Sequence, residues 1–143
     1  MRFIGTHFQT VDPKGRIAFP SKFKRLLGPD DQGTMVLTLG REHCLLLYPL
    51  SEWTALAEAL DALPRNQAKR DAIRSISDHT TELELDSHGR LTIPREFLDQ
   101  AGIERDVAVV GSLRYVEVWG REVYERGGEA RRTAAGEILD QLF

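Results

Sequence analysis

Apolar residues recur along the chain with two different spacings, and the change from one to the other predicts the order of the elements. Apolar residues at every second position are typical of strands with one buried face, whereas spacings of three and four are typical of amphipathic helices. The first half of the chain has the order strand, strand, short helix, strand, strand, helix, helix. The strands are predicted at 7–11, 17–19, 35–39 and 45–48, and the helices at 20–28, 51–63 and 66–76.

Turn-forming residues between these segments predict how they connect. The turn at 12–15 should join the first two strands into a β-hairpin, and the turn at 40–43 should join the next two. Ser51 and Asn66 can cap the helices that follow them. Gly28 stands after the short helix, where a left-handed residue is favoured. The first half is therefore predicted to contain two hairpins, each followed by helical sequence.

The same order returns in the second half, together with a motif that is copied almost residue by residue. Residues 12–23 recur 74 positions later as residues 86–97, with Asp, Gly, Arg, Pro and Phe at identical places. Repetition at a fixed offset indicates a duplicated unit. A half of about 70 residues would be only marginally stable alone, so we expect the two halves to share one core. Trp53 and Tyr124 occupy matching helices, which should pack similarly.

A third segment follows the second copy. Two glycines at 127 and 128 interrupt the chain, and apolar residues with helical spacing come after them. The spacing predicts a terminal helix, which could dock on the body of the protein or on another subunit. The apolar stripe consists of Ala130, Ala134, Ile138 and Leu142.

The composition limits the class of protein. The chain has 143 residues, of which 41% are hydrophobic and 29% charged, and these values are ordinary for a soluble globular protein. No apolar run approaches the roughly 20 residues that span a bilayer, and the N-terminal sequence lacks the apolar segment of a signal peptide. We therefore expect a cytosolic protein without a membrane segment. A single cysteine, Cys44, excludes an intrachain disulfide and a zinc site built from cysteines.

Charge is distributed unevenly between the two copies. The whole chain has a net charge of −3, which argues against indiscriminate binding to nucleic acid. Residues 1–28 nevertheless contain six basic residues and one acidic residue, a net charge of +5, whereas the matching residues 75–102 have a net charge of −4. A protein that attracts a polyanion could concentrate its positive potential in this way, although an ordinary uneven surface would look the same.

The duplicated motif places an arginine beside an aspartate at a turn. Asp12 to Gly15 have the residue preferences of a type I turn, and Gly15 is expected to have a positive φ. Arg16 leaves the turn close enough to Asp12 for the carboxylate to orient the guanidinium. An oriented guanidinium can bind a phosphate or the two acceptors on the major-groove edge of guanine. The second copy repeats the arrangement with Asp86, Gly89 and Arg90.

Two copies of Asp-x-x-x-Arg, each followed by apolar-x-apolar-Pro and a short helix with Phe, resemble the MraZ family. The sequence from Cys44 to Pro49 and the following Trp53 match the same family, and the resemblance covers about residues 3–125. It implies an α+β, mainly β fold: a duplicated swapped-hairpin barrel of the AbrB/SpoVT type, pseudo-twofold, with flanking short helices. The implied segments are a first repeat at 5–50, a helical connection at 51–77, a second repeat at 78–121 and a C-terminal helical tail at 122–143.

The resemblance also implies a function and a set of site residues. It implies a bacterial transcriptional regulator of the division and cell wall gene cluster, which binds double-stranded DNA at direct repeats upstream of its own operon. The chains would assemble into a ring in the cytoplasm, associated with the nucleoid. From the residues themselves we expect no cofactor and no metal. The second copy departs from the first at His88 and Glu96, which replace Lys14 and Lys22, so its contribution is expected to be smaller. The candidate DNA-binding residues are Asp12, Lys14, Arg16, Lys22, Asp86, His88 and Arg90.

Two other classes of protein compete with a DNA-binding regulator. An enzyme is disfavoured because the chain lacks the common nucleophile, zinc and phosphate-loop motifs, and because His43 and Cys44, as neighbours on a strand, should face opposite ways. The other histidines, His7, His79 and His88, are interpreted as turn or surface residues rather than metal ligands. The alternative is an oligomeric protein-assembly module whose basic face binds an acidic protein partner.

Overall fold

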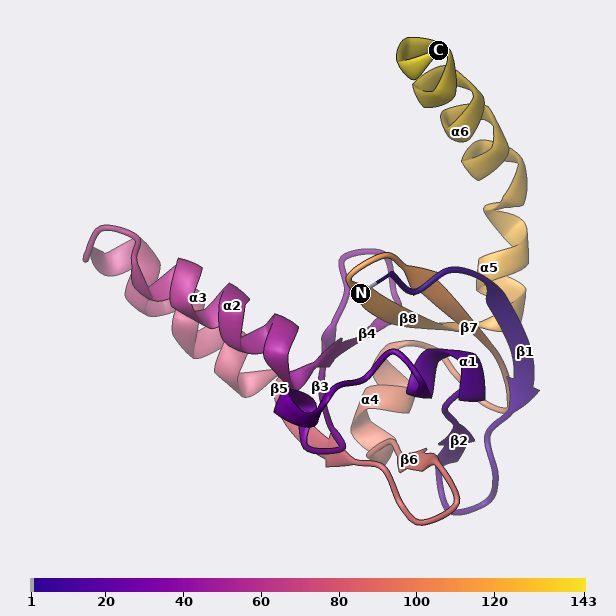
Figure 1. Cartoon of the computed structure of the whole chain (residues 1–143), viewed down its shortest axis with the longest axis horizontal. Coiled ribbons are helices and arrows are strands. Elements are labelled where there is room, and N and C mark those ends of the chain that lie inside the picture. The colour runs from indigo at the N-terminus through magenta and orange to yellow at the C-terminus, as the bar shows by residue number, and fades with distance from the viewer. Residues whose placement is uncertain (1) are drawn as a thin grey trace.

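The computed structural model describes residues 2–143, and within that range it contains both strands and helices of each copy of the repeat (Figure 1). In chain order the elements are β1 (Thr6–Thr10), β2 (Arg16–Ala18), α1 (Ser21–Lys24), a 3-10 turn (Pro29–Asp31), β3 (Thr34–Leu39), β4 (Leu45–Pro49), α2 (Leu50–Asp61), α3 (Gln67–Asp78), β5 (Thr80–Glu84), β6 (Arg90–Thr92), α4 (Arg95–Gln100), β7 (Asp106–Ser112), β8 (Tyr115–Gly120), α5 (Arg121–Arg126) and α6 (Gly128–Leu142).

The strands form two antiparallel sheets in which the copies exchange partners. The larger sheet has the order β1-β7-β8-β4-β3-β5, and the smaller sheet pairs β2 with β6. Replacing each strand by its counterpart in the other copy leaves both orders unchanged, because β1 corresponds to β5, β3 to β7 and β4 to β8. The first strand of each copy therefore pairs with the other copy, so that neither half has a complete sheet of its own.

This exchange corrects the prediction that the first two strands form a hairpin. The turn at 12–15 forms, but β1 pairs with β7, with Thr6 opposite Val110, and β2 pairs with β6, with Ile17 opposite Leu91. Alternation along a strand shows which face is buried and carries no information about the partner strand. The hairpin predicted around residues 40–43 is confirmed by the pairing of β3 with β4.

The α+β class and the antiparallel sheets agree with the expected fold, but a closed barrel is not found. Among residues 2–143, the larger sheet ends at β1 and β5, and no strand pairing joins these two edges. The ribbon of β2 and β6 is a separate sheet rather than a bridge between them. The assembly is thus an open six-stranded sheet with a two-stranded ribbon.

Both copies contribute to one hydrophobic core, as their small size predicted. Phe3 and Phe23 from the first copy are fully buried and pack edge to face, with ring centroids 5.4 Å apart. The matching helices α2 and α5 also pack alike, each through one aromatic residue against the preceding strand. The ring centroids of Tyr48 and Trp53 are 5.6 Å apart, and those of Trp119 and Tyr124 are 5.9 Å apart. The core residues of the second copy include Leu91, Ile93, Phe97, Val107, Val109, Val116 and Val118.

Three local predictions had different outcomes. Asn66 caps α3, since its side chain accepts a hydrogen bond from the Lys69 N–H at 2.8 Å. Ser51 is not a cap: it lies inside α2, and its hydroxyl donates to Asp31 at 2.6 Å. Gly28 is extended, with a φ of −103°, because it precedes the 3-10 turn and its N–H donates to the Asp31 carboxylate. The predicted left-handed conformation at Gly28 is therefore wrong.

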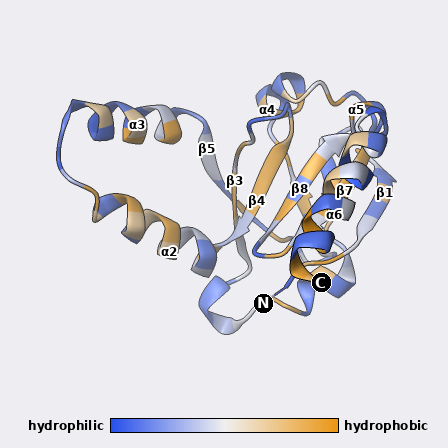
Figure 2. Cartoon of the chain, turned by 90° about the horizontal axis from the view of Figure 1, so that it is seen from above, coloured by the Kyte–Doolittle hydropathy of each residue, from blue (hydrophilic) through white to orange (hydrophobic). Residues whose placement is uncertain are grey.

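Three helices extend away from the core. Helices α2 and α3 lie side by side and point out from the sheet, and α6 points out in another direction (Figure 1). None of the three contains a buried residue. Apolar residues lie along the facing sides of α2 and α3 (Figure 2). The terminal helix does not dock on the body of its own chain, since Ile138 is 56% exposed and Leu142 is 71% exposed.

Candidate functional site

The two arginines of the duplicated motif meet on the ribbon formed by β2 and β6. In its register Arg16 is opposite Thr92 and Ala18 is opposite Arg90. Ile17 and Leu91 between them are buried, so the alternate positions that carry both arginines face outward. Arg16 and Arg90 are diagonal neighbours on this face, a relation that separates residues by about 7–8 Å. The strand exchange thus brings together two side chains that are 74 positions apart.

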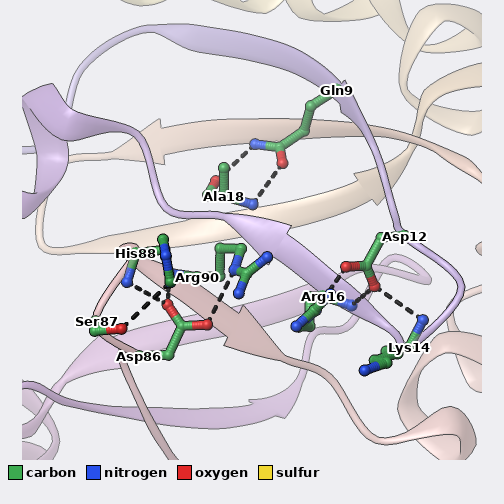
Figure 3. A network of polar contacts seen from close by, with 9 residues as sticks. All are labelled: Gln9, Asp12, Lys14, Arg16, Ala18, Asp86, Ser87, His88 and Arg90. Carbon is green, nitrogen blue, oxygen red and sulfur yellow. Dashed lines mark hydrogen bonds and ion pairs between the residues drawn. The ribbon is translucent and has the colours of Figure 1, made fainter.

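In the first loop, Asp12 organises both the turn and the arginine. The N–H of Gly15 donates to the Asp12 carbonyl at 2.9 Å, which closes the predicted turn, and Gly15 has the expected positive φ of 82°. One carboxylate oxygen of Asp12 accepts hydrogen bonds from the backbone N–H groups of Lys14 and Arg16, both at 2.9 Å. The other oxygen accepts one from Arg16 Nε at 2.6 Å (Figure 3).

The second loop repeats this geometry with Asp86. Its carboxylate accepts hydrogen bonds from the N–H groups of His88 at 2.8 Å and Arg90 at 2.9 Å, and from Arg90 Nε at 3.0 Å. Gly89 has a φ of 73°, as predicted. The expectation that each aspartate orients its arginine is therefore confirmed in both copies.

These contacts keep both carboxylates ionised. The pKa of Asp12 is lowered, chiefly because the Arg16 N–H donates to the charged carboxylate. The pKa of Asp86 is lowered to about 2, chiefly by the Arg90 N–H. A carboxylate that stays charged at neutral pH is suited to holding an arginine rather than to exchanging protons with a substrate.

The arginines keep unused hydrogen-bond donors on the exposed face. Each contacts its aspartate through Nε, and within residues 2–143 their terminal Nη groups donate to no other residue. The side chains of Arg16 and Arg90 are 26% and 33% exposed. Two guanidinium groups with fixed orientation and free terminal donors can bind phosphate oxygens or the paired acceptors of guanine.

The remaining predicted residues occupy different surroundings. Lys14 and His88 lie in the two turns, and the His88 ring lies 3.2 Å from the Ser87 hydroxyl. Lys22 is exposed on α1 and makes no hydrogen bond to either loop. Lys24 is one of the six basic residues of 1–28 but is not among the predicted DNA-binding residues, although its Nζ lies only 3.7 Å from the position that a Cβ at Gly89 would occupy.

Lys24 therefore adds a charge from the first copy to the loop of the second. Its counterpart in the second copy, Leu98, lies next to Gly15 in the same manner, with the nearest carbon 3.9 Å from an added Cβ. The difference between the two residues is visible in the sequence at the 74-residue offset. The position of Lys24 beside the second loop depends on the strand exchange, and the sequence pattern alone does not predict that exchange.

Other chemistry finds little support in the structure. Cys44 is buried, and burial raises the pKa of its thiol to about 12, so it remains protonated and unreactive. His43 lies in the predicted turn at 40–43, with a φ of 61°, and not on a strand, so the argument that strand neighbours face opposite ways does not apply to it. Within residues 2–143 there is no cluster of three acidic, histidine or cysteine residues that could hold a metal. Over the same range, no helix has both the length and the apolar character required to span a bilayer.

Comparisons with known proteins cover nearly the whole chain. The family model described as "MraZ protein, putative antitoxin-like" matches residues 2–75 and again 76–132. A protein of Desulfitobacterium hafniense named "Transcriptional regulator MraZ" is 36% identical over 98% of this chain and 98% of its own length. A protein of Legionella pneumophila with the same name is 36% identical over 98% of this chain and 93% of its own. A third, from Clostridium tetani, is 36% identical over 90% and 88%.

Proposed function

The chain belongs to the MraZ family, whose members named above are transcriptional regulators rather than enzymes, and from this premise we propose that it binds specific DNA sequences through the ribbon of β2 and β6. Its targets are direct repeats upstream of its own operon, in the division and cell wall gene cluster. This assignment rests on the family resemblance, and the nucleoid-associated cytoplasm follows as the compartment in which such a regulator works.

The observation that carries the proposal is the pair of guanidinium groups on one face of a two-stranded ribbon. Arg16 and Arg90 are each fixed by an aspartate through Nε, which leaves the terminal donors available. The major groove of B-DNA accommodates a two-stranded antiparallel ribbon, and its guanine edges offer the acceptor pair that a guanidinium matches. Lys14 in the first turn and Lys24 beside the second add charges suited to the phosphate backbone, and Lys22 is exposed on α1.

Fluorescence anisotropy with labelled DNA from upstream of the protein's own gene tests the proposal. Wild type should prefer this DNA over scrambled DNA, and Arg16→Ala should lose about 1–3 kcal/mol of that preference, the range for one bidentate base contact. Arg65→Ala is the matched control, because Arg65 lies between α2 and α3, which point away from the ribbon (Figure 1). Equal binding of wild type to both DNAs would refute sequence-specific recognition.

Assembly into a homo-oligomeric ring is the second part of the proposal. Helices α2 and α3 expose apolar side chains that no other part of residues 2–143 covers, and an open cavity of about 510 Å³ lies between them. Trp53, Leu60, Ile73 and Ile76 are among the residues that line it. We propose that another copy of the chain covers this apolar surface. A ring would present many β2–β6 ribbons to repeated DNA sites, so that after one ribbon binds, the effective concentration of the others at neighbouring sites is raised.

Light scattering coupled to gel filtration tests the ring. Wild type should elute as a discrete oligomer, and Ile73→Glu should reduce its mass because a charge would enter the contact surface. A monomeric wild type would contradict assembly without affecting the assignment of the DNA-binding face.

An assembly module for an acidic protein partner is the alternative function. It would use the same basic face but would show no preference among DNA sequences. Salt provides a further distinction, since the logarithm of DNA affinity falls by about 0.9 per neutralised phosphate for each log unit of salt.

A further inference from the structure

The outer edge of β2 is bonded by a side chain where a neighbouring strand would be expected. The N–H of Phe19 points to β6 and donates to the Gly89 carbonyl at 2.9 Å, so the backbone groups of Ala18 point the opposite way, to β1. There the Gln9 side chain takes both: its Nε2 donates to the Ala18 carbonyl at 2.7 Å, and its Oε1 accepts from the Ala18 N–H at 2.7 Å (Figure 3). One side-chain amide thus reproduces the paired bonds of a β-ladder.

We call these two hydrogen bonds between the Gln9 side chain and the Ala18 backbone the Gln9 clasp. The second copy has no equivalent of the clasp. Leu83 stands where the repeat offset would place Gln9, and Thr92 stands in the place of Ala18. Leucine has no polar group, and in the part of the chain that the structure describes no side chain bonds the Thr92 backbone. The first loop is also the tighter of the two, with Nε and carboxylate 2.6 Å apart compared with 3.0 Å in the second.

We propose that Gln9 is a positioning residue for DNA recognition, because its hydrogen bonds hold β2 against β1. As a result, the first loop makes most of the contacts to bases. The inference rests on the proposed function and assigns unequal roles within it. Ala18 is two residues from Arg16 on the same outward face, so holding its backbone limits rotation of the strand that carries the guanidinium. The second loop, without the clasp, contributes mainly charge through Arg90 and Lys24.

The expected effect of the clasp follows from preorganisation. A strand that is already fixed loses less conformational freedom on binding, and ordering one mobile side chain costs about 0.5–1.5 kcal/mol, or roughly 2- to 13-fold in affinity. The Gln9 bonds are exposed, so water can replace them in the free protein and folding stability should change little. Affinity and stability should therefore respond differently to loss of the clasp.

Gln9→Leu tests the inference by copying the residue of the second repeat. We expect affinity for the DNA from upstream of the protein's own gene, here called operator DNA, to fall by about 3- to 10-fold. This lies within the range set by ordering one side chain. Affinity for scrambled DNA and the slope of log affinity against log salt should stay constant, because no phosphate contact is lost. Hydrogen exchange at the Ala18 N–H should accelerate. Gln67→Leu on α3 is the matched control and should leave all four quantities unchanged.

The outcomes separate the inference from the proposed function. Faster exchange at Ala18 with unchanged operator affinity would overturn the positioning role while leaving DNA binding intact. An equal loss of affinity for operator and scrambled DNA, with a lower melting temperature, would mean that Gln9 serves the fold and would also overturn it. A wild type that does not distinguish the two DNAs would refute the proposed function itself, whatever Gln9→Leu does.

Discussion

Replacing Gly15 by alanine should destabilise the protein more than the same replacement at Gly89, although both glycines occupy the same place in the motif. Both have a positive φ, 82° at Gly15 and 73° at Gly89, which alanine adopts only with strain. The space around them differs. A Cβ at Gly15 would lie 2.9 Å from the Ile93 carbonyl oxygen, whereas the nearest atom to a Cβ at Gly89 is Lys24 Nζ at 3.7 Å, the end of a flexible side chain.

The magnitudes follow from two contributions. Left-handed alanine costs about 1–2 kcal/mol at either position, and the stiffer unfolded chain offsets about 0.4–1 kcal/mol of that. At Gly15 the displaced backbone adds about 1–3 kcal/mol, as overpacking does elsewhere. Gly89→Ala should therefore lower the free energy of unfolding by about 1 kcal/mol and Gly15→Ala by about 2–4 kcal/mol.

Urea denaturation followed by circular dichroism measures this difference, with both variants at one protein concentration because assembly would couple stability to concentration. The unfolding slope should be the same for the two, so that the midpoints report stability directly. Equal destabilisation by the two variants would refute the strand exchange as described, since the 2.9 Å approach depends on β6 lying against the first turn.

Three further predictions concern single side chains. Lys24→Leu should reduce the slope of log affinity for DNA against log salt by about 0.9, and an unchanged slope in anisotropy titrations would show that Lys24 does not contact a phosphate. The Asp86 carboxyl should titrate in NMR spectra near a pKa of about 2, so its stabilising contacts should be complete above about pH 4 and lost as pH falls through 2; titration near the ordinary value would contradict its hydrogen bonds. The Cys44 thiol should resist Ellman's reagent at pH 8 in the native protein and react after denaturation, whereas rapid native reaction would contradict its burial.

The sequence predicts the hydrogen bonds within each loop better than the strand pairing that brings the two loops together. The pairing of Asp12 with Arg16 and the positive φ of Gly15 depend on residues within one turn, so local preferences suffice to predict them. The partner of β2 lies 74 positions away, and alternation gives no information about it. For this reason the first hairpin was predicted wrongly, and Lys24 was not placed beside the second loop.

The local errors have a similar physical origin. Gly28 and Ser51 were assigned roles from their places next to helices, but both form hydrogen bonds to Asp31, a buried residue of the 3-10 turn. A tertiary hydrogen bond to a buried carboxylate outweighs the weaker preference for a cap or a left-handed end. The expected barrel came from the family resemblance, and it is not found because no strand pairing joins β1 to β5 within residues 2–143.

The central claim, that an oriented arginine recognises DNA sequence, is tested most directly by Arg16→Lys in anisotropy titrations. Lysine retains the charge but lacks the planar fork that Asp12 orients. The account predicts that the variant keeps the salt dependence of wild type and binds scrambled DNA equally well, while its preference for the operator is largely lost. Retention of the full preference by Arg16→Lys would contradict the account, because the arginine would then contribute charge alone.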